Sequence, residues 1–369
     1  MKVGKKQSSL LGAIAFGTVI ALTPTSGSAI YFSGKKIEIT IPTKEGGGSD
    51  RFGRIFQPFL EKHLPGHPTV LVINRPGGSG IKGGNWFQHK APRDGTALFV
   101  TGSSPLNSFL FAGKKVQYQL RTWKPIILSS FGTCFYAHKR LGLSGKPEDV
   151  VADIKKLRAA DRLLMGAKNS TSSEIRSFLL YDIMGMDQAR PVFGLSSGNR
   201  RKATLRGELE LGMDSTLSCQ TKIKKYVDKG TIQIYMTMGL IDDNGKIVRD
   251  PAMPDVPHAK EVYEKVYGKE PSGQAWKAYM HFLNLNVMAQ KGLWLPDGTP
   301  DDVYEFYVST FKKIFADKEF QKITKKSFGK YPHAFGEKAK KIAIDALDFA
   351  PETKEWMKNW IKKKMVSSS

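Results

Sequence analysis

The sequence feature that most constrains the fold is a glycine-rich stretch at residues 36–54. It begins with a β-branched run at residues 37–41, which Pro42 ends, and three glycines, Ser49 and Asp50 follow. Apolar side chains then recur at helical spacing, at Phe52, Ile55, Phe56, Phe59 and Leu60. The pattern predicts a strand, a glycine loop and a helix, with Ser49 or Asp50 as the helix cap.

A loop of this kind can bind an anion. Gly46, Gly47 and Gly48 let backbone N–H groups approach a ligand with no side chain in the way. The first-turn amides and the dipole of the helix favour a negative charge at the same place. The pattern also fits a tight β–α turn without a ligand, so this stretch alone leaves both interpretations open.

The amino terminus is typical of an export signal. Basic residues precede an uncharged apolar segment at residues 10–22, and Gly27-Ser28-Ala29 offers small residues for cleavage. We therefore expect residues 1–29 to be a signal peptide, cleaved near Ala29, and the mature protein to be periplasmic. No later stretch has the ~20 apolar residues that a membrane helix needs.

The chain is strongly basic, with 57 Lys and Arg against 34 Asp and Glu and a formal net charge of +23. Such a charge is compatible with nucleic acid, an anionic surface or anionic small ligands as partners. The lysines are scattered, and we find no zinc finger and no aromatic-basic ribonucleoprotein motif. We therefore expect no nucleic-acid partner.

Metal and cofactor motifs have little support. The histidines do not cluster with cysteines or carboxylates at ligand spacing, so we expect no metal and no cofactor. Residues 78–83 match the dinucleotide pattern G-x-G-x-x-G, but a turn separates them from the preceding strand and the expected acidic residue is missing. Cys134 and Cys219 are the only cysteines, and the sequence allows either one disulfide or two buried thiols.

The length predicts two domains. Strands and helices alternate along both halves, which is typical of α/β sheets flanked by helices. We expect residues 30–130 and 248–369 to form one lobe and residues 131–247 to form the other. Residues 284–293 are predicted as a strand, and helices follow to the end of the chain.

Three loops, near residues 46–50, 166–173 and 194–199, have similar composition and position. Each follows a strand, opens a helix and is rich in Gly, Ser, Thr or Asn. In open α/β sheets, ligands bind at the carboxyl ends of the strands. Two lobes facing each other across such loops would form a cleft of amides and hydroxyls that suits a carboxylate. The candidate ligand-binding residues are Gly46, Gly47, Gly48, Ser49, Asp50, Thr171, Ser172, Ser196, Ser197, Gly198 and Asn199, with Asp214 at the far end of the ligand.

One alternative is an enzyme. Residues 194–198 match the nucleophile pattern G-x-S-x-G, which would make the protein an exported esterase with Ser196 as its nucleophile. A hydrolase also needs an acid and a histidine, and Asp214 or Asp255 with His258 or His281 could be proposed. Nothing in the sequence pairs them, so we expect a protein without catalytic residues.

Several segments together resemble the periplasmic solute-binding receptors of tripartite tricarboxylate transporters, also called Bug-type receptors. The resemblance rests on the first loop with Arg54, and on four later motifs at residues 72–77, 91–96, 251–257 and 296–300. The order and spacing of these motifs are more specific than any one of them. The resemblance covers nearly the whole mature chain.

The resemblance implies a two-lobed, Venus-flytrap fold that closes on a small carboxylate without chemistry. It implies that the first loop and the loop at Ser196–Asn199 hold the carboxylate, largely through main-chain amides, and that the loop at Thr171–Ser172 adds hydroxyls. It also implies membrane transporter subunits as partners of a monomer. Glu45 and Glu174 depart from the family pattern, and they leave the identity of the ligand open.

Overall fold

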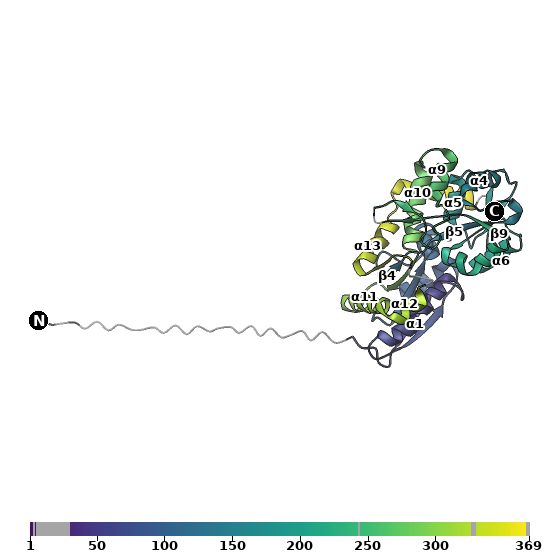
Figure 1. The fold of residues 1–369 in the computed structure, drawn as a ribbon. Helices are drawn as coiled ribbons and strands as arrows, with labels where there is room; N and C mark the ends of the chain where they lie inside the picture. Colours follow the sequence, from purple (N-terminus) through teal and green to yellow (C-terminus); the bar gives the residue numbers. More distant parts are fainter. Residues whose placement is uncertain (3, 5–29, 243, 326–329, 367–369) are drawn as a thin grey trace. The chain divides into compact units, whose positions relative to one another are not determined.

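The computed structural model describes residues 1–2, 4, 30–242, 244–325 and 330–366. Most of the predicted signal peptide, including its apolar segment and its cleavage site, lies outside the described residues. The residues from Tyr31 onward form one compact unit, and two helix-flanked sheets build it (Figure 1). The expected α/β class is therefore confirmed. Within the described part of the chain, no helix is both long and apolar enough to cross a membrane.

The first sheet has six strands in the order β13-β4-β12-β3-β1-β2. β1 is parallel to β2 and β3, whereas β12 is antiparallel to β3 and β4. Alternate isoleucines of β1 are fully buried, as expected for a strand in the core of an α/β layer. The strands are β1 (Lys36–Ile41), β2 (Thr69–Asn74), β3 (Ala97–Gly102), β4 (Lys124–Ser129), β12 (Lys291–Leu295) and β13 (His333–Phe335).

The second sheet has five strands in the order β7-β6-β8-β5-β9. β6 is parallel to β7 and β8, and β5 is antiparallel to β8 and β9. The strands are β5 (Thr133–His138), β6 (Leu163–Gly166), β7 (Ala189–Val192), β8 (Leu211–Ser215) and β9 (Ile232–Thr237). A short antiparallel pair, β10 (Leu240–Ile241) and β11 (Ile247–Val248), follows β9.

Helices cover both sheets. Near the first sheet, α1, α11 and α12 pack together through Phe56, Phe311 and Phe320 (Figure 1). The helices are α1 (Gly48–His63), α2 (Ile81–Lys90), α3 (Ser103–Phe111), α4 (Val150–Ala159), α5 (Ile175–Ile183), α6 (Ser197–Leu205), α7 (Thr216–Ser218), α8 (Lys224–Asp228), α9 (Ala259–Tyr267), α10 (Gly273–Leu283), α11 (Asp301–Ala316), α12 (Lys318–Thr324), α13 (Gly336–Leu347) and α14 (Pro351–Ile361).

Two local predictions are wrong. Residues Asn284–Met288 extend α10 as a π-helical turn, and the strand predicted at 284–293 begins only at Lys291. A short apolar run fits a buried helix segment as well as a strand, so its composition could not decide between them. The N-cap of α1 is Gly47, without a side-chain cap, because Ser49 and Asp50 already lie in the first helical turn.

The carboxyl-terminal segments contact elements around the second sheet. α9 packs against α4 and β9, and α10 packs against α5. Trp360 Nε1 of α14 donates to Asp182 Oδ2 of α5 at 2.8 Å, and Lys364 Nζ, after α14, donates to Oδ1 at 2.5 Å. Segments after β11 therefore contact elements around the second sheet. The residue boundaries of the two lobes stay a prediction.

Cys134 and Cys219 form a disulfide, with their Cα atoms 6.8 Å apart. Cys134 lies in β5, and Cys219 follows α7 in a π-helical turn. Both side chains are buried in a small apolar cluster with Tyr136, Ile223 and Ile232. Of the two alternatives that the sequence allows, the structure has the disulfide.

Candidate functional site

The first glycine loop joins β1 to α1 at the carboxyl edge of the first sheet. Gly46 and Gly48 are exposed, so their backbone is open to a ligand. Asp50 is buried and holds the loop: its carboxylate accepts from Gly46 N at 2.8 Å, Arg54 Nε at 2.9 Å and Asn74 Nδ2 at 2.9 Å. The carboxylate of Asp50 therefore shapes the loop, and the amides of the first helical turn remain without an i−4 acceptor.

Lys291 reaches the same place from β12, which is separated from β1 by β3 in the first sheet. It is the first residue of β12 and pairs with Gly102, the last residue of β3. Its Nζ donates to Ser49 Oγ at 3.1 Å, in the first turn of α1. A Cβ atom on Gly102 would lie 2.8 Å from Ser49 Oγ and 3.3 Å from Lys291 Nζ. The absence of a side chain at Gly102 therefore allows Lys291 Nζ to approach Ser49 Oγ.

The second loop, between β6 and α5, contains a buried ion cluster. Glu174 is fully buried, and its Oε1 accepts from Arg200 Nη1 at 2.5 Å and from Lys168 Nζ at 3.1 Å. Burial alone raises the pKa of Glu174, but the charges of Lys168 and Arg200 outweigh it and hold this pKa well below its usual range. Glu174, which departs from the family pattern, is thus the internal counter-ion of two cations.

The predicted hydroxyls of the second loop are partly engaged by the protein. The Ser172 hydroxyl donates to Asn169 O at 2.8 Å, and the Ser172 side chain is fully buried. Thr171 is half-buried, and its amide donates to Asn169 Oδ1 at 3.0 Å. The contact of these two residues with a ligand remains a prediction.

This second loop also touches the end of the first sheet. Lys168 Nζ donates to Ser104 Oγ at 3.2 Å, and Asn107 Nδ2 donates to Ser172 O at 3.3 Å. The buried Arg176 donates to Ser103 Oγ at 3.1 Å and to Asn286 O at 3.0 Å. Segments that are far apart in sequence therefore meet where the carboxyl ends of the two sheets approach each other.

The third loop opens α6. Ser196 is its N-cap, with Oγ accepting from Asn199 N at 3.3 Å, and Ser197 begins the helix. Gly198 and Asn199 are exposed. Two residues on, Arg201 donates to both carboxylate oxygens of Asp214, at 3.0 and 2.5 Å. Tyr136 donates to the same carboxylate at 3.0 Å, so Asp214 is already paired within the protein.

The geometry gives no support to the esterase alternative. Ser196 uses its hydroxyl as a helix cap. His258 caps α9 and contacts Glu261, and His281 stacks on Phe349. Among the described residues, neither histidine has a contact with Ser196, so the arrangement of nucleophile and base that acyl transfer needs is not assembled.

Arg51 links the first loop electrostatically to the third. It lies in α1, yet its pKa is lowered by burial and then by the charge of Arg201 in α6, against the opposing effect of Asp214. The pKa of Lys222 is lowered by burial and by the same two arginines. The charges of Arg51, in the amino-terminal turn of α1, and Arg201, in α6, are therefore close enough to affect each other.

We call the side chains that interact in this region the cationic cluster. It has seven basic residues and three carboxylates: Arg51, Lys168, Arg176, Arg200, Arg201, Lys222 and Lys291, with Asp50, Glu174 and Asp214. The three carboxylates cannot neutralise seven cations, so the cluster attracts anions. Sequence reasoning did not select Lys291, Lys168 or Arg51, because scattered lysines and arginines carry no local signal.

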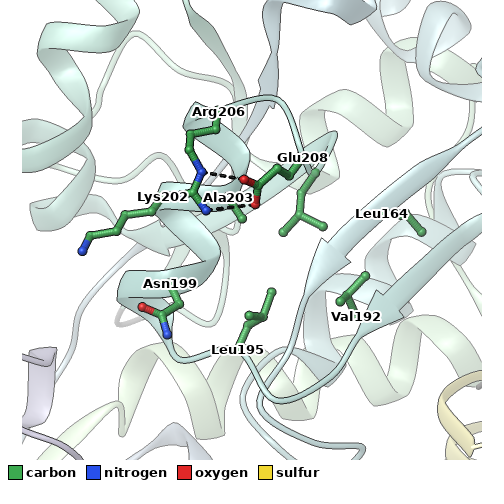
Figure 2. Close-up of a pocket in the computed structure, with 9 residues that line it drawn as sticks. Leu164, Val192, Leu195, Asn199, Lys202, Ala203, Arg206 and Glu208 are labelled. Carbon is green, nitrogen blue, oxygen red and sulfur yellow. Dashed lines mark hydrogen bonds and ion pairs between the residues drawn. The ribbon is translucent and has the colours of Figure 1, made fainter.

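Two pockets lie outside this cluster. The larger, about 520 Å³, is lined by Leu164, Val192, Leu195, Asn199, Lys202, Ala203, Arg206, Glu208 and Leu209. Figure 2 shows its apolar side chains between α6 and the strands, with the Arg206–Glu208 pair at one side. The smaller, about 370 Å³, includes Thr171 and residues at the end of α14. Of the predicted site residues, only Asn199 and Thr171 line these pockets.

No known family model and no curated protein matches the sequence. The structure is similar to MatC from Rhodopseudomonas palustris with bound malate, at 17% identity and a TM-score of 0.62, over 88% of this chain and 98% of MatC. It is similar to the periplasmic binding protein BugD, at 19% identity and a TM-score of 0.61, over 89% and 96% of the two chains. Rpa4515 from R. palustris with adipate gives 17% identity and a TM-score of 0.64, over 89% and 97%. The chain therefore has the α/β fold of these binding proteins, among them the periplasmic binding protein BugD.

Proposed function

We propose that this protein is an extracytoplasmic solute-binding receptor. In this proposal it binds a carboxylate-bearing organic anion between its two lobes and delivers it to a tripartite tricarboxylate-type membrane transporter. It acts in the periplasm as a monomer after removal of its signal peptide, and it catalyses no reaction. The fold supports the proposal, since two proteins of similar structure hold malate and adipate.

The observation that carries the proposal is the cationic cluster between the two predicted anion-binding loops. Burying a carboxylate is unfavourable unless hydrogen bonds and an opposite charge compensate it. Amides at the start of α1 supply hydrogen-bond donors, and the unneutralised cations of the cluster supply the charge. This proposed site includes Gly46–Ser49 and Ser196–Asn199, with Asp50 and Asp214 as residues that hold Gly46 and Arg201 in place.

We expect dicarboxylates to bind more tightly than monocarboxylates of equal chain length, because the excess positive charge in the cluster favours a second negative charge. A thermal-shift screen would compare adipate with hexanoate, and malate with 2-hydroxybutyrate, at several salt concentrations. A ligand at a hundredfold excess over its Kd stabilises the folded state by about 2.7 kcal/mol, which such a screen detects. Equal shifts for both members of each pair would contradict the expected charge preference, and shifts with none of the four would contradict the receptor proposal.

We expect Gly48→Val to reduce carboxylate affinity by at least about 30-fold, the scale of losing one hydrogen bond to a charged group. Gly48 is exposed, and a Cβ atom there meets only Lys291, at 3.9 Å, so the fold accommodates the change. The branched side chain would cover the amides of the first turn. Lys318→Val, at the exposed first position of α12, is the matched control. Calorimetry showing equal affinity in both variants would remove the first loop from the site.

A further inference from the structure

Lys291 occupies an unusual position for a cation. It stands at the start of β12, beside the carboxyl ends of β3 and β4, and its ammonium contacts Ser49 in the first turn of α1. The amino-terminal end of a helix carries a partial positive charge, which disfavours a second positive charge nearby. A charged lysine at this position destabilises the folded protein unless an anion binds beside it.

The charged groups that face Lys291 do not supply this anion. Lys168 comes from the loop after β6, Arg176 from α5 and Arg51 from α1, and all three are cationic. The carboxylate of Glu174 in the cluster is already shared by Lys168 and Arg200. Asp50 faces Gly46, Arg54 and Asn74. Among the described residues, no carboxylate forms an ion pair with Lys291, whose ammonium donates to the neutral Ser49 hydroxyl.

Resting on the proposed receptor function, we propose that Lys291 is the residue that pairs with an anionic carboxylate of the ligand, next to the amides of α1. In the free protein the Lys291 ammonium donates to one neutral group, the Ser49 hydroxyl, and the ligand carboxylate would accept a further, charged hydrogen bond from it. Charge pairing with a side chain then adds to main-chain recognition and selects ligands with a fully ionised carboxylate.

The titration of Lys291 gives the proposed pairing a consequence that can be measured, the uptake of a proton on binding. Burial, followed by the charges of Lys168, Arg176 and Arg51, lowers the pKa of Lys291 to about 7 in the free protein. A bound carboxylate raises this pKa again, so binding takes up a proton at any pH between the two values. At pH 7.5 the uptake is expected to be about three quarters of a proton per ligand. Above pH 7.5, Kd should rise about tenfold per pH unit until the pKa of the complex is reached.

The test is isothermal titration calorimetry with malate, adipate and citrate, in two buffers of different ionisation enthalpy at pH 7.5. We expect the wild type to bind with the stated proton uptake. Lys291→Met should lose about 100-fold in affinity, together with the uptake. Lys291→Arg keeps a charge that does not titrate, and it should bind within a few-fold of the wild type without the uptake. Lys312→Met, an exposed lysine of α11, is the control and should behave as the wild type.

The outcomes separate the two proposals. Wild-type binding without proton uptake, or full affinity in Lys291→Met, overturns the role of Lys291 and leaves the receptor function standing. If the wild type binds none of the three acids, the receptor function fails, and the inference that rests on it fails as well. Folding of Lys291→Met is checked by its melting transition, and Lys291→Arg gives an independent reading in which the charge is retained.

Discussion

Glu174→Gln is expected to destabilise the protein by about 3–5 kcal/mol, the largest stability effect that we predict. Glu174 is fully buried and is the shared counter-ion of Lys168 and Arg200. The isosteric amide keeps the shape of the side chain but removes its charge. Arg200, which is 1% exposed, cannot lose its proton, so an uncompensated charge would remain in the interior.

The measurement is the melting temperature and the denaturant midpoint of the purified variant. Glu208→Gln is the matched control, because Glu208 also pairs with an arginine, Arg206, but both groups are exposed. Exposed ion pairs contribute little, so the control should melt as the wild type does. Equal stability of Glu174→Gln and the control would show that Arg200 is compensated in another way, for example through Asp214.

The sequence predicts best those elements whose structure depends on neighbouring residues. The strand, glycine loop and helix at residues 36–63 follow from neighbouring residues, and the structure confirms their order. The sequence predicts one strand over residues 284–293, but the structure has a helical turn at Asn284–Met288 and a strand only from Lys291. Tertiary contacts decide there: Asn286 donates to Asn107 Oδ1 at 3.0 Å and its carbonyl accepts from Arg176, which favours a helical turn before the strand begins.

The site was harder to predict than the fold. The first and third loops carry a local signal, since glycine and small polar residues follow each strand. Lys291 carries none, because 242 residues separate it from Ser49 and only the antiparallel position of β12 beside β3 brings the two together. The role of Glu174 is equally non-local, as its partner Arg200 comes from a different helix. Pairing over such distances depends on strand order, which single residues do not reveal.

Lys291→Met is expected to raise the melting temperature of the ligand-free protein at pH 6 by a few degrees, although it removes ligand affinity. The native state holds a partly buried ammonium among other cations, and its pKa of about 7 lies below the unfolded value of about 10.4. At pH 6 both states are protonated, so the native state carries the full unfavourable charge. After allowance for solvent screening, this term is on the order of 2 kcal/mol.

The pH dependence fixes the sign of this effect. Between pH 7 and about 10.4 the unfolded wild type binds more protons at Lys291 than the native state does, so its stability at this residue rises with pH. The advantage of Lys291→Met should therefore be largest below pH 7 and should shrink steadily above it, while Lys312→Met shows no such trend. An advantage that grows with pH would mean that Lys291 gains stability from its charge. In that case an internal partner, and no ligand, would be its counter-ion.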